Sequence, residues 1–375
     1  MTEARPDKTR ICAVIPDLRT GGAQRVLLTL VEEWARQGHT VFLLTLDSAD
    51  HDFFTVPPGV QRVSVGGLTP SDSALTAIRQ NTRRIRGLRR AIAASRPDVV
   101  VSFIDLMNVT VLAACLGLRV RTFVSERVYP PAHHIGLPWR FLRRALYPSA
   151  DGVVMQTQLG HAWATAFVNA EKVAVIPNPV SRGFLGAPSG SAVRTKAIVA
   201  AGRLVHQKGF DLLLAAFARS RARALGWRLR ILGDGVERGA LTALAALLGV
   251  SDVVELGGAS DSLAHEFSTA SVFVLPSRGE GFPNALLEAM AMGCAVIATD
   301  CTTGPRDMVS DGVDGILVPN EDVDRLTEAL NRLMGSQSDR EELGRNATRV
   351  RERFAPETIA NKWIALFDAT VSKPA

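Results

Sequence analysis

Two glutamates eight residues apart flank the most informative stretch of the sequence. Proline is favoured at the first position of a helix, so Pro283 places Glu280 in a loop and Glu288 inside the helix that follows. The backbone N–H groups of residues 284–286 would then face an anion. Carboxylates accept hydroxyl donors, so the pair could hold a sugar and a ribose on either side of a diphosphate. Spacing alone leaves open a capping charge and an exposed helix residue; a hydrolytic acid–base pair is disfavoured because no water-activating partner is evident.

Two cations follow the first strand expected in the second half of the chain. Arg203 and Lys208 lie between an apolar run that ends at Ala201 and a helix expected to start near Asp211. This places both cations at the carboxyl edge of a sheet, where ligands bind in doubly wound folds. A guanidinium binds phosphate oxygens in a bidentate manner and an ammonium acts as a point charge. The pair therefore favours a diphosphate, and a solvated loop with unrelated charges is the alternative.

A glycine turn, Gly21-Gly22, follows the first strand of the chain and precedes a helix. Two glycines let a ligand approach the backbone closely, and the start of the helix offers N–H groups to an anion. The turn does not match G-x-G-x-x-G, so it gives no dinucleotide-binding fingerprint. A plain strand-to-helix turn is the alternative.

We expect neither a metal nor a bound cofactor. The pairs Asp322/Asp324 and Asp50/Asp52 have D-x-D spacing, but the first opens a helical stretch, where acids favour the helix dipole, and the second lies in a short polar loop. The four cysteines lie far apart, which argues against a cysteine zinc site or a disulfide scaffold and suits a reducing cytoplasm.

The net charge of the whole chain is +6, and its basic residues gather in the first half. Between Asp72 and Asp98 there are seven arginines and no acid, and residues 138–147 mix cations with bulky apolar groups. Basic amphipathic helices bind anionic membrane surfaces, so a membrane partner is expected, with a solvated helix face as the alternative. The few aromatic residues and the lack of a recognised module argue against nucleic acid. The residues assigned to this acceptor or membrane side are Arg83, Arg84, Arg90, Arg143 and Arg144.

The elements that position these groups form two α/β domains. Short apolar, β-branched runs alternate with helical patterns through both halves of the chain, which favours parallel sheets covered on both faces. We predict domains over 1–180 and 196–355, a proline- and glycine-rich linker over 181–195, and a last helical segment over 356–375. Two doubly wound domains predict a ligand cleft between them. No apolar run is long enough to cross a bilayer, and the first residues show no signal-peptide pattern.

With these residues placed, the sequence resembles a retaining glycosyltransferase of family 4, with the GT-B fold of two Rossmann-like domains. The resemblance covers nearly the whole chain and rests on motifs that are weak alone but specific in this order. The motifs are Gly21-Gly22-Ala23-Gln24, Gly202-Arg203-Leu204 with Gln207-Lys208-Gly209, Gly233-Asp234-Gly235, Pro276-Ser277 before the two glutamates, and Thr303-Gly304-Pro305-Arg306-Asp307. The last motif and Ser125-Glu126-Arg127 are similar to members that extend lipid-linked glycans in bacterial polysaccharide assembly.

The resemblance implies a role for each motif. Arg203 and Lys208 would hold the donor diphosphate, Glu280 would contact the donor sugar, and Glu288 would bind the ribose. The other implied donor-binding residues are Gly21, Gly22, Gly202, Phe282, Pro283, Asn284, Ala285 and Leu286. Many relatives have a histidine that touches the donor sugar where Ser125-Glu126-Arg127 stands. The resemblance therefore offers Glu126 or Arg127 as the first-domain catalytic residue, and both are assigned to the acceptor or membrane side. The last helix of this fold usually crosses back onto the first domain.

The implied reaction is metal-independent transfer of a hexose or N-acetylhexosamine from a nucleotide sugar, with retention at the anomeric carbon. Uridine is the expected base and guanosine the alternative. The acceptor would be a glycan or a polyprenyl-diphosphate-linked glycan, at the cytoplasmic face of the plasma membrane. The rivals are a sugar-nucleotide 2-epimerase of the same architecture and a non-catalytic, membrane-associated protein that binds sugar nucleotides. A nicotinamide-dependent oxidoreductase is disfavoured by the missing glycine fingerprint.

Overall fold

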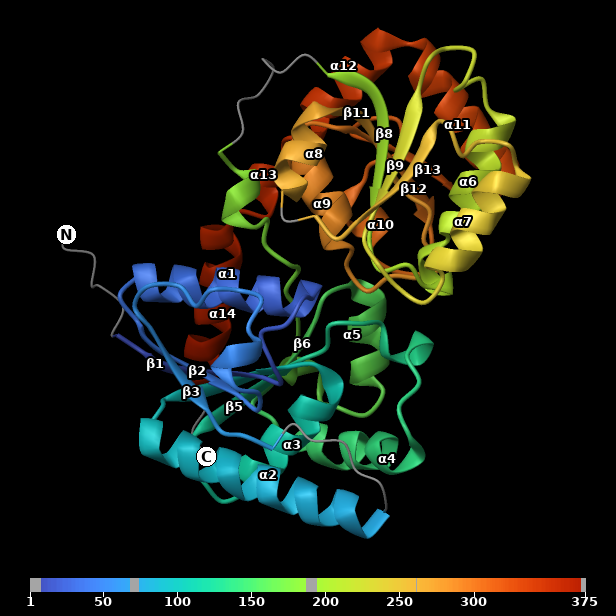
Figure 1. Ribbon diagram of the computed structural model, residues 1–375. Coiled ribbons are helices and arrows are strands. Elements are labelled where there is room, and N and C mark those ends of the chain that lie inside the picture. Colours follow the sequence, from blue (N-terminus) through green and yellow to red (C-terminus); the bar gives the residue numbers. More distant parts are fainter. Residues whose placement is uncertain (1–7, 68–73, 187–193, 261, 372–375) are drawn as a thin grey trace, which may run out of the picture. The chain divides into compact units, whose positions relative to one another are not determined.

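The computed structural model describes residues 8–67, 74–186, 194–260 and 262–371, and it divides into two compact units (Figure 1). Unit one comprises Met1–Pro179 with Pro356–Ala375, and unit two is the continuous segment Val180–Ala355. The sequence placed a linker over 181–195. In the structure, the short helix Arg182–Phe184 belongs to unit two, where the Phe184 ring packs on the Phe267 ring at 6.1 Å between centroids. Residues 187–193 lie outside the described part of the chain.

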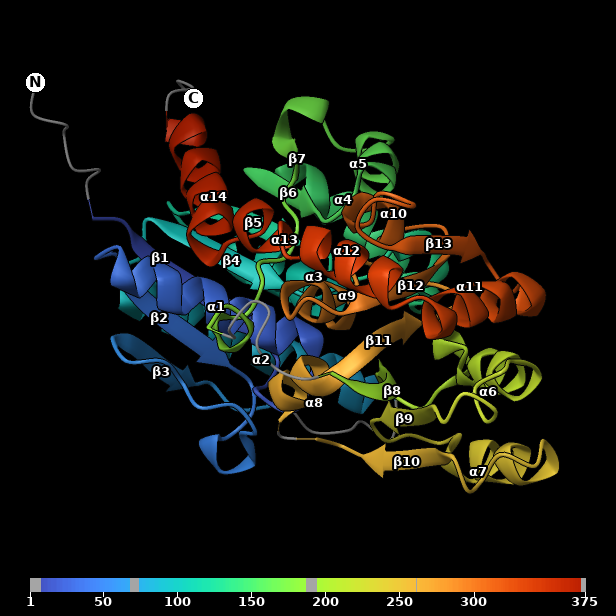
Figure 2. The same cartoon turned by 90° about the horizontal axis from the view of Figure 1, so that it is seen from above.

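Unit one contains a seven-stranded sheet whose strands are all parallel. The strands are β1 (Arg10–Ile15), β2 (Thr40–Thr45), β3 (Val60–Ser64), β4 (Val99–Phe103), β5 (Arg121–Ser125), β6 (Gly152–Met155) and β7 (Val173–Val175). Their spatial order is β3-β2-β1-β4-β5-β6-β7, which can be followed across the sheet in Figure 2. Strands β1 and β4 are buried almost throughout, as expected for a sheet covered on both faces. The parallel sheet covered on both faces, which the alternating pattern predicted for this half, is confirmed.

Helices cover both faces of the unit-one sheet. They are α1 (Gly22–Arg36), α2 (Ala74–Ser95), α3 (Asp105–Cys115), α4 (Leu137–Leu146), α5 (Gln158–Thr165) and α14 (Pro356–Val371). In Figure 1, α1 lies on one face of the sheet and α2 on the other. The last helix, α14, packs against α1 through Trp363, whose ring meets Trp34 at 6.2 Å and Phe103 at 6.0 Å between centroids. The final segment of the chain is therefore part of the core of unit one.

Unit two repeats the same winding with six parallel strands. They are β8 (Thr195–Ala201), β9 (Arg228–Leu232), β10 (Val254–Gly258), β11 (Ala270–Leu275), β12 (Ala295–Asp300) and β13 (Ile316–Pro319), in the order β10-β9-β8-β11-β12-β13. The helices are α6 (Phe210–Arg219), α7 (Arg238–Leu247), α8 (Leu263–Thr269), α9 (Asn284–Ala291), α10 (Pro305–Met308), α11 (Val323–Gly335), α12 (Gln337–Ala347) and α13 (Val350–Arg353). The predicted α/β class with two doubly wound domains is confirmed.

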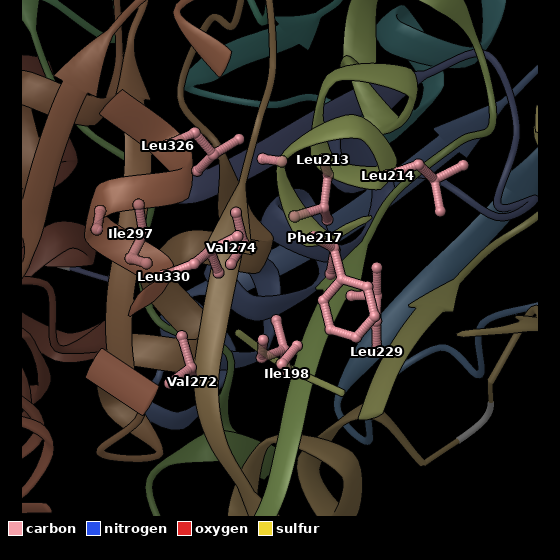
Figure 3. Close-up of a cluster of buried hydrophobic side chains, with 14 of the residues drawn as sticks. Ile198, Leu213, Leu214, Phe217, Leu229, Val272, Val274, Ile297, Leu326 and Leu330 are labelled. Carbon is pink, nitrogen blue, oxygen red and sulfur yellow. The ribbon is translucent and has the colours of Figure 1, made fainter. Parts of the chain in front are cut away.

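The core of unit two fixes the strands on which the candidate site is built. Figure 3 shows side chains from β8, β9, β11 and β12 meeting those of α6 and α11. Leu213, Phe217 and Leu330 are among the buried members, and each such side chain stabilises the fold by about 1.5–3 kcal/mol. This packing holds the carboxyl ends of β8 and β11 side by side, because those strands are neighbours in the sheet.

Six single-turn helices complete the described elements. They are η1 (Ala49–His51), η2 (Pro130–Ala132), η3 (Tyr147–Ser149), η4 (Ala170–Lys172), η5 (Arg182–Phe184) and η6 (His206–Lys208). Of the helices in the described ranges, none has both the length and the apolar character that a bilayer crossing requires.

Candidate functional site

The loops that follow β8, β9 and β11 meet at the carboxyl edge of the unit-two sheet. Gly202 comes directly after β8 and Gly233 directly after β9. A Cβ at Gly233 would lie 1.9 Å from the Gly202 carbonyl oxygen, so only glycine permits this approach. A Cβ at Gly202 would lie 3.4 Å from the Lys208 side chain. Gly202, at the start of the loop that carries Arg203 and Lys208, therefore lies beside the Lys208 side chain.

The turn that carries Lys208 is hydrogen-bonded to the loop that carries Glu280. The Arg278 N–H donates to the Gln207 carbonyl at 2.8 Å, and the Gln207 side-chain amide donates to the Gly279 carbonyl at 2.7 Å. Gly209 has a φ of 64°, and a Cβ there would lie 2.0 Å from the Pro276 carbonyl oxygen. The two segments thus fit together only with a glycine at the end of η6.

Arg278 strengthens this junction through its side chain and was not singled out from the sequence. Its guanidinium donates to both carboxylate oxygens of Asp211, at 2.8 and 2.6 Å, and to the His206 carbonyl at 2.8 Å. Burial acts to raise the pKa of Asp211, but the hydrogen bonds and charge of Arg278 hold it below the usual value. The only signal in the sequence was the position of Arg278, two residues before Glu280.

Lys208 and Glu280 form an ion pair. The Lys208 Nζ lies 2.6 Å from Glu280 Oε1, and the two side chains are 18% and 7% exposed. The Ser277 hydroxyl donates to the same carboxylate oxygen at 2.6 Å, and the Thr303 hydroxyl donates to the Glu280 carbonyl. The resemblance implied separate roles for Lys208 and Glu280, whereas in the structure each is the ion-pair partner of the other. An incoming diphosphate would therefore meet a lysine that already has a counter-charge.

Arg203 differs from Lys208 because it is exposed. Its side chain makes no hydrogen bond or ion pair with the residues that the structure describes. Backbone hydrogen bonds hold its loop, since the Leu204 N–H donates to the Asp234 carbonyl at 2.9 Å. The loop is therefore fixed while the guanidinium stays available.

Helix α9 begins one residue later than the sequence predicted. Pro283 is its N-cap, and the first helical residue is Asn284. The Leu287 N–H donates to the Pro283 carbonyl at 3.2 Å, so the N–H groups of residues 284–286 come before this first helical bond. The carboxyl edge of the unit-two sheet thus carries the N-terminus of α9 together with the ion-paired Lys208 and the exposed Arg203.

Two side chains around α9 lie differently from the simplest expectation. Glu288 is only 2% exposed, so it is not a solvated helix residue. Phe282 is 5% exposed, and its ring packs on the Phe354 ring at 5.7 Å between centroids. The Phe282 ring is therefore part of the packing of unit two. Leu286 is also buried, whereas Asn284 and Ala285 are partly exposed.

The glycine turn of unit one is covered by a neighbouring side chain. Gly21 is the N-cap of α1, and a Cβ there would lie 2.2 Å from Gln24 Oε1. The Gln24 amide in turn donates to Asp17 Oδ1 at 3.0 Å. Gly21 is therefore needed for the approach of Gln24. Gly22 is the first residue of α1 and has interactions of its own.

Glu126 lies in a buried polar cluster at the carboxyl end of β5. Its Oε1 accepts hydrogen bonds from the Tyr147 hydroxyl at 2.5 Å and from Arg143 Nη1 at 3.4 Å. Burial raises the pKa of Glu126 to about 7, against the opposing effects of Arg143 and Tyr147. Arg143, assigned to the acceptor or membrane side, is only 5% exposed, and its guanidinium donates to Glu126 inside the unit rather than facing a surface.

The other basic residues of unit one have mixed surroundings. Arg83, Arg90 and Arg144 are exposed, whereas Arg84 donates to the Gly67 carbonyl at 2.6 Å. The Arg89 side chain donates to carbonyl groups at the end of α3. The basic surface is therefore smaller than the count of arginines indicated.

The acidic pairs considered as metal ligands have structural partners: Asp50 accepts from the Ser48 hydroxyl at 2.7 Å, and Asp52 pairs with Arg62. Asp322 caps α11 by accepting from the Arg325 N–H at 2.9 Å, and Asp324 pairs with Arg219. Within the described ranges, no three or more His, Cys, Asp or Glu side chains are grouped to hold a metal ion.

Two family models match successive parts of the chain. The model described as Glycosyltransferase Family 4 matches residues 20–184, and the model described as Glycosyl transferases group 1 matches residues 195–336.

Curated relatives of the chain include two bacterial enzymes. The chain is 27% identical, over 95% of its length and 98% of the relative, to a Campylobacter jejuni α-1,4-N-acetyl-D-galactosaminyltransferase named for an undecaprenol-diphosphate-linked substrate. It is 39% identical over 289 residues to an exopolysaccharide phosphotransferase of Streptomyces coelicolor. That match covers 76% of this chain but only 30% of the relative.

Solved structures share the fold over nearly the full chain. Sucrose-phosphate synthase of Thermosynechococcus elongatus superposes with a TM-score of 0.80 at 22% identity, covering 97% of this chain and 99% of that one. HepE of Anabaena in complex with UDP superposes with a TM-score of 0.78 at 17% identity, covering 96% and 100%. At these identities the likeness concerns the fold alone.

Proposed function

The chain belongs to the family 4 glycosyltransferases, and from this premise we propose that it transfers a hexose or N-acetylhexosamine from a nucleotide sugar to a glycan acceptor. One observation carries the proposal most directly. The loop after β8 carries Lys208 and the exposed Arg203, and the first turn of α9 follows the loop after β11. Both loops lie at the same carboxyl edge of the unit-two sheet. Such an edge is the usual ligand site of doubly wound folds, and its charges suit a diphosphate.

The proposed mechanism relies on stabilising the departing diphosphate. Arg203 and the N–H groups at the start of α9 would bind phosphate oxygens, and Lys208 would add a second cation. Glu280 orients Lys208, and buried Glu288 would accept the ribose hydroxyls. We propose transfer with retention at the anomeric carbon and without a metal ion, because the cations and peptide N–H groups supply the charge stabilisation that a metal would otherwise give.

The acceptor is proposed to be a lipid-linked or polysaccharide glycan. The support comes from relatives, one named for an undecaprenol-linked substrate and one for exopolysaccharide. Uridine diphosphate is the proposed carrier of the donor sugar, because HepE, which shares the fold, was crystallised with UDP.

Nucleotide sugars should protect the protein against thermal unfolding, since a ligand that binds only the folded state raises its apparent stability. We expect a UDP-sugar to raise the Tm.

Arg203→Ala should lower the transfer rate at least tenfold, because it removes the exposed cation proposed to bind the diphosphate. Arg219→Ala is the matched control, because it removes an exposed cation of unit two whose surface ion pair contributes little. A chelator should leave the rate intact. Loss of all activity on chelation, or an Arg203→Ala variant as active as the control, would contradict this mechanism.

The epimerase alternative is separated by an assay without acceptor. An epimerase would convert the nucleotide sugar by itself, whereas the proposed transferase needs an acceptor to form product. A non-catalytic binding protein would tolerate Glu280→Gln without a detectable effect. We expect Glu280→Gln to weaken donor use, because it removes the negative partner that holds Lys208 at 2.6 Å.

We further propose that unit one binds the inner face of the plasma membrane through α4 and α2. Leu137 and Phe141 lie one turn apart on α4 and are 75% and 73% exposed, beside exposed Arg140 and Arg144. An apolar face flanked by cations suits an anionic interface, where each cation contributes about 1 kcal/mol. All four cysteines are buried and free, as in proteins of a reducing compartment.

Flotation with phosphatidylglycerol vesicles tests this attachment. The protein should float with the vesicles at low salt and less at high salt, because exposed charges are screened. Phe141→Ser should reduce flotation, whereas Val236→Ser should not, since Val236 is an even more exposed apolar residue but lies in unit two. Equal flotation of both variants, or none by the wild type, would contradict the membrane assignment.

A further inference from the structure

Side chains that follow four neighbouring strands converge at the carboxyl edge of the unit-one sheet. Phe103 ends β4, Arg127 comes two residues after β5, Gln156 directly follows β6, and Asn178 comes three residues after β7. These strands are adjacent in the order β4-β5-β6-β7. Polar groups gathered at such an edge mark a ligand site in open α/β sheets.

The Arg127 guanidinium is held on two sides. Its carbon atom lies 3.4 Å from the centroid of the Phe103 ring, and Nη1 donates to Asn178 Oδ1 at 2.7 Å. The Gln156 amide donates to the same Asn178 oxygen at 2.7 Å. Gln156 and Asn178 are both buried. The orientation of Arg127 is therefore fixed by its surroundings before any ligand arrives.

The remaining face of Arg127 has no partner. Nε and Nη2 are buried and make no hydrogen bond with the described residues. These two nitrogens share one edge of the guanidinium, which is an edge that binds two oxygens of a phosphate or carboxylate. The adjacent Glu126 makes no hydrogen bond to them: its Oε1 accepts from Tyr147 and Arg143, and its Oε2 is buried without a hydrogen-bond partner among the described residues. A buried charged donor without a partner is costly, so its presence calls for a function.

The backbone beside Arg127 carries strain. Ile104, directly after β4, has a φ of 78°, which a β-branched residue rarely adopts. Its N–H donates to the Ser125 carbonyl at 3.2 Å, next to the Glu126-Arg127 segment. Strain of this kind concentrates at binding sites and switch regions. The Arg127 side chain as a whole is partly exposed, so a small local opening would uncover the two nitrogens.

We propose that Arg127 is a diphosphate-binding residue of unit one, with its Nε and Nη2 edge receiving two phosphate oxygens. The proposal rests on the transferase function proposed above, which supplies two sources of this group: the nucleotide sugar and a polyprenyl-diphosphate acceptor. Both present the same chemistry to the guanidinium. The two sources are separated by experiment.

Calorimetric titration of the full chain with two probes tests the proposal. UDP represents the donor, farnesyl diphosphate represents the lipid acceptor, and farnesol controls for the lipid chain alone. Arg127→Gln removes the charge and Arg127→Lys keeps it but lacks the planar fork. Arg119→Gln is the matched control, because Arg119 is exposed and lies before the opposite end of β5.

We expect both Arg127 variants to bind one diphosphate probe at least tenfold more weakly than the Arg119→Gln control, with farnesol binding unchanged. Weaker UDP binding identifies the donor as the source, and weaker farnesyl diphosphate binding identifies the acceptor. Unchanged affinities for both probes, or a wild type that binds neither, would overturn the proposal. So would variants that fail to fold, since Arg127 would then be a structural residue. A wild type that transfers sugar while the variants bind normally would remove this inference and leave the proposed function standing.

Discussion

At the scale of a single residue, Glu126 shows how burial changes the protonation state of a side chain in this protein. Its carboxyl group is buried, and burial raises its pKa to about 7 from the ordinary 4.5. Between these two pH values the unfolded chain releases the proton while the folded protein keeps it. Folding therefore loses stability as the pH rises through this window, because the unfolded state binds fewer protons there. The shift corresponds to about 3 kcal/mol.

Glu126→Gln should remove this pH dependence. Glutamine can still accept the hydrogen bond of the Tyr147 hydroxyl but does not ionise. We expect the free energy of unfolding of the variant, measured in urea, to gain about 3 kcal/mol on that of the wild type between pH 4.5 and pH 8. Glu357→Gln, at an exposed position of α14, should follow the wild type. Parallel pH profiles for wild type and Glu126→Gln would show that Glu126 is ionised throughout.

The elements of the site depend on close approaches that glycine alone allows. The φ of 64° at Gly209 and the nearby Pro276 carbonyl join η6 to the loop after β11. Gly249 has a similar φ of 67° but no atom within 4 Å of its added Cβ. The two glycines have similar φ values and differ in the space that an added Cβ would find.

Gly209→Ala should therefore cost more than Gly249→Ala. A left-handed conformation costs an alanine about 1–2 kcal/mol, and Gly209→Ala must in addition displace the Pro276 backbone. We expect a larger loss in the free energy of unfolding and a UDP affinity at least tenfold weaker, because η6 carries Lys208. Titration of both variants with UDP is the measurement. Equal affinities would show that the junction does not position the donor site.

The sequence predicted elements better than contacts, for physical reasons. Strands such as β4 and β11 are continuous apolar runs because both faces of their sheets are covered, so their positions could be predicted. The start of α9 was misplaced by one residue because proline also fits the N-cap. The pairing of Lys208 with Glu280, 72 residues apart, depends on the neighbouring positions of β8 and β11, which no local pattern encodes. The bond between Arg278 and Asp211 was missed for the same reason.

At the scale of the whole molecule, the chain leaves unit one at Pro179 and returns to it at Pro356. The returning helix brings Trp363, 1% exposed, against Trp34 and Phe103. The Gln37 amide also donates to Asn361 Oδ1 at 2.9 Å, which ties α14 to the end of α1. The stability of unit one therefore depends on residues at the far end of the sequence.

Trp363→Ala should destabilise unit one and spare unit two. Removal of a buried tryptophan costs about 3–5 kcal/mol, and the first unit holds all of its ring contacts. We expect calorimetry to show a lower Tm for one unfolding transition only. Leu330→Ala, in the core of unit two, should lower the other transition. A common shift of both transitions by Trp363→Ala would show that the units unfold together.

The return of the chain to unit one also orders events during synthesis. A ribosome delivers Val180–Ala355 as one uninterrupted stretch, so unit two can become complete while translation continues. Unit one, although its strands are made first, leaves the hydrophobic side chains of Trp34 and Phe103 uncovered until α14 has been made. The half that is made first therefore completes its core only after unit two has been made, and a stop codon just before α14 would damage the amino-terminal half.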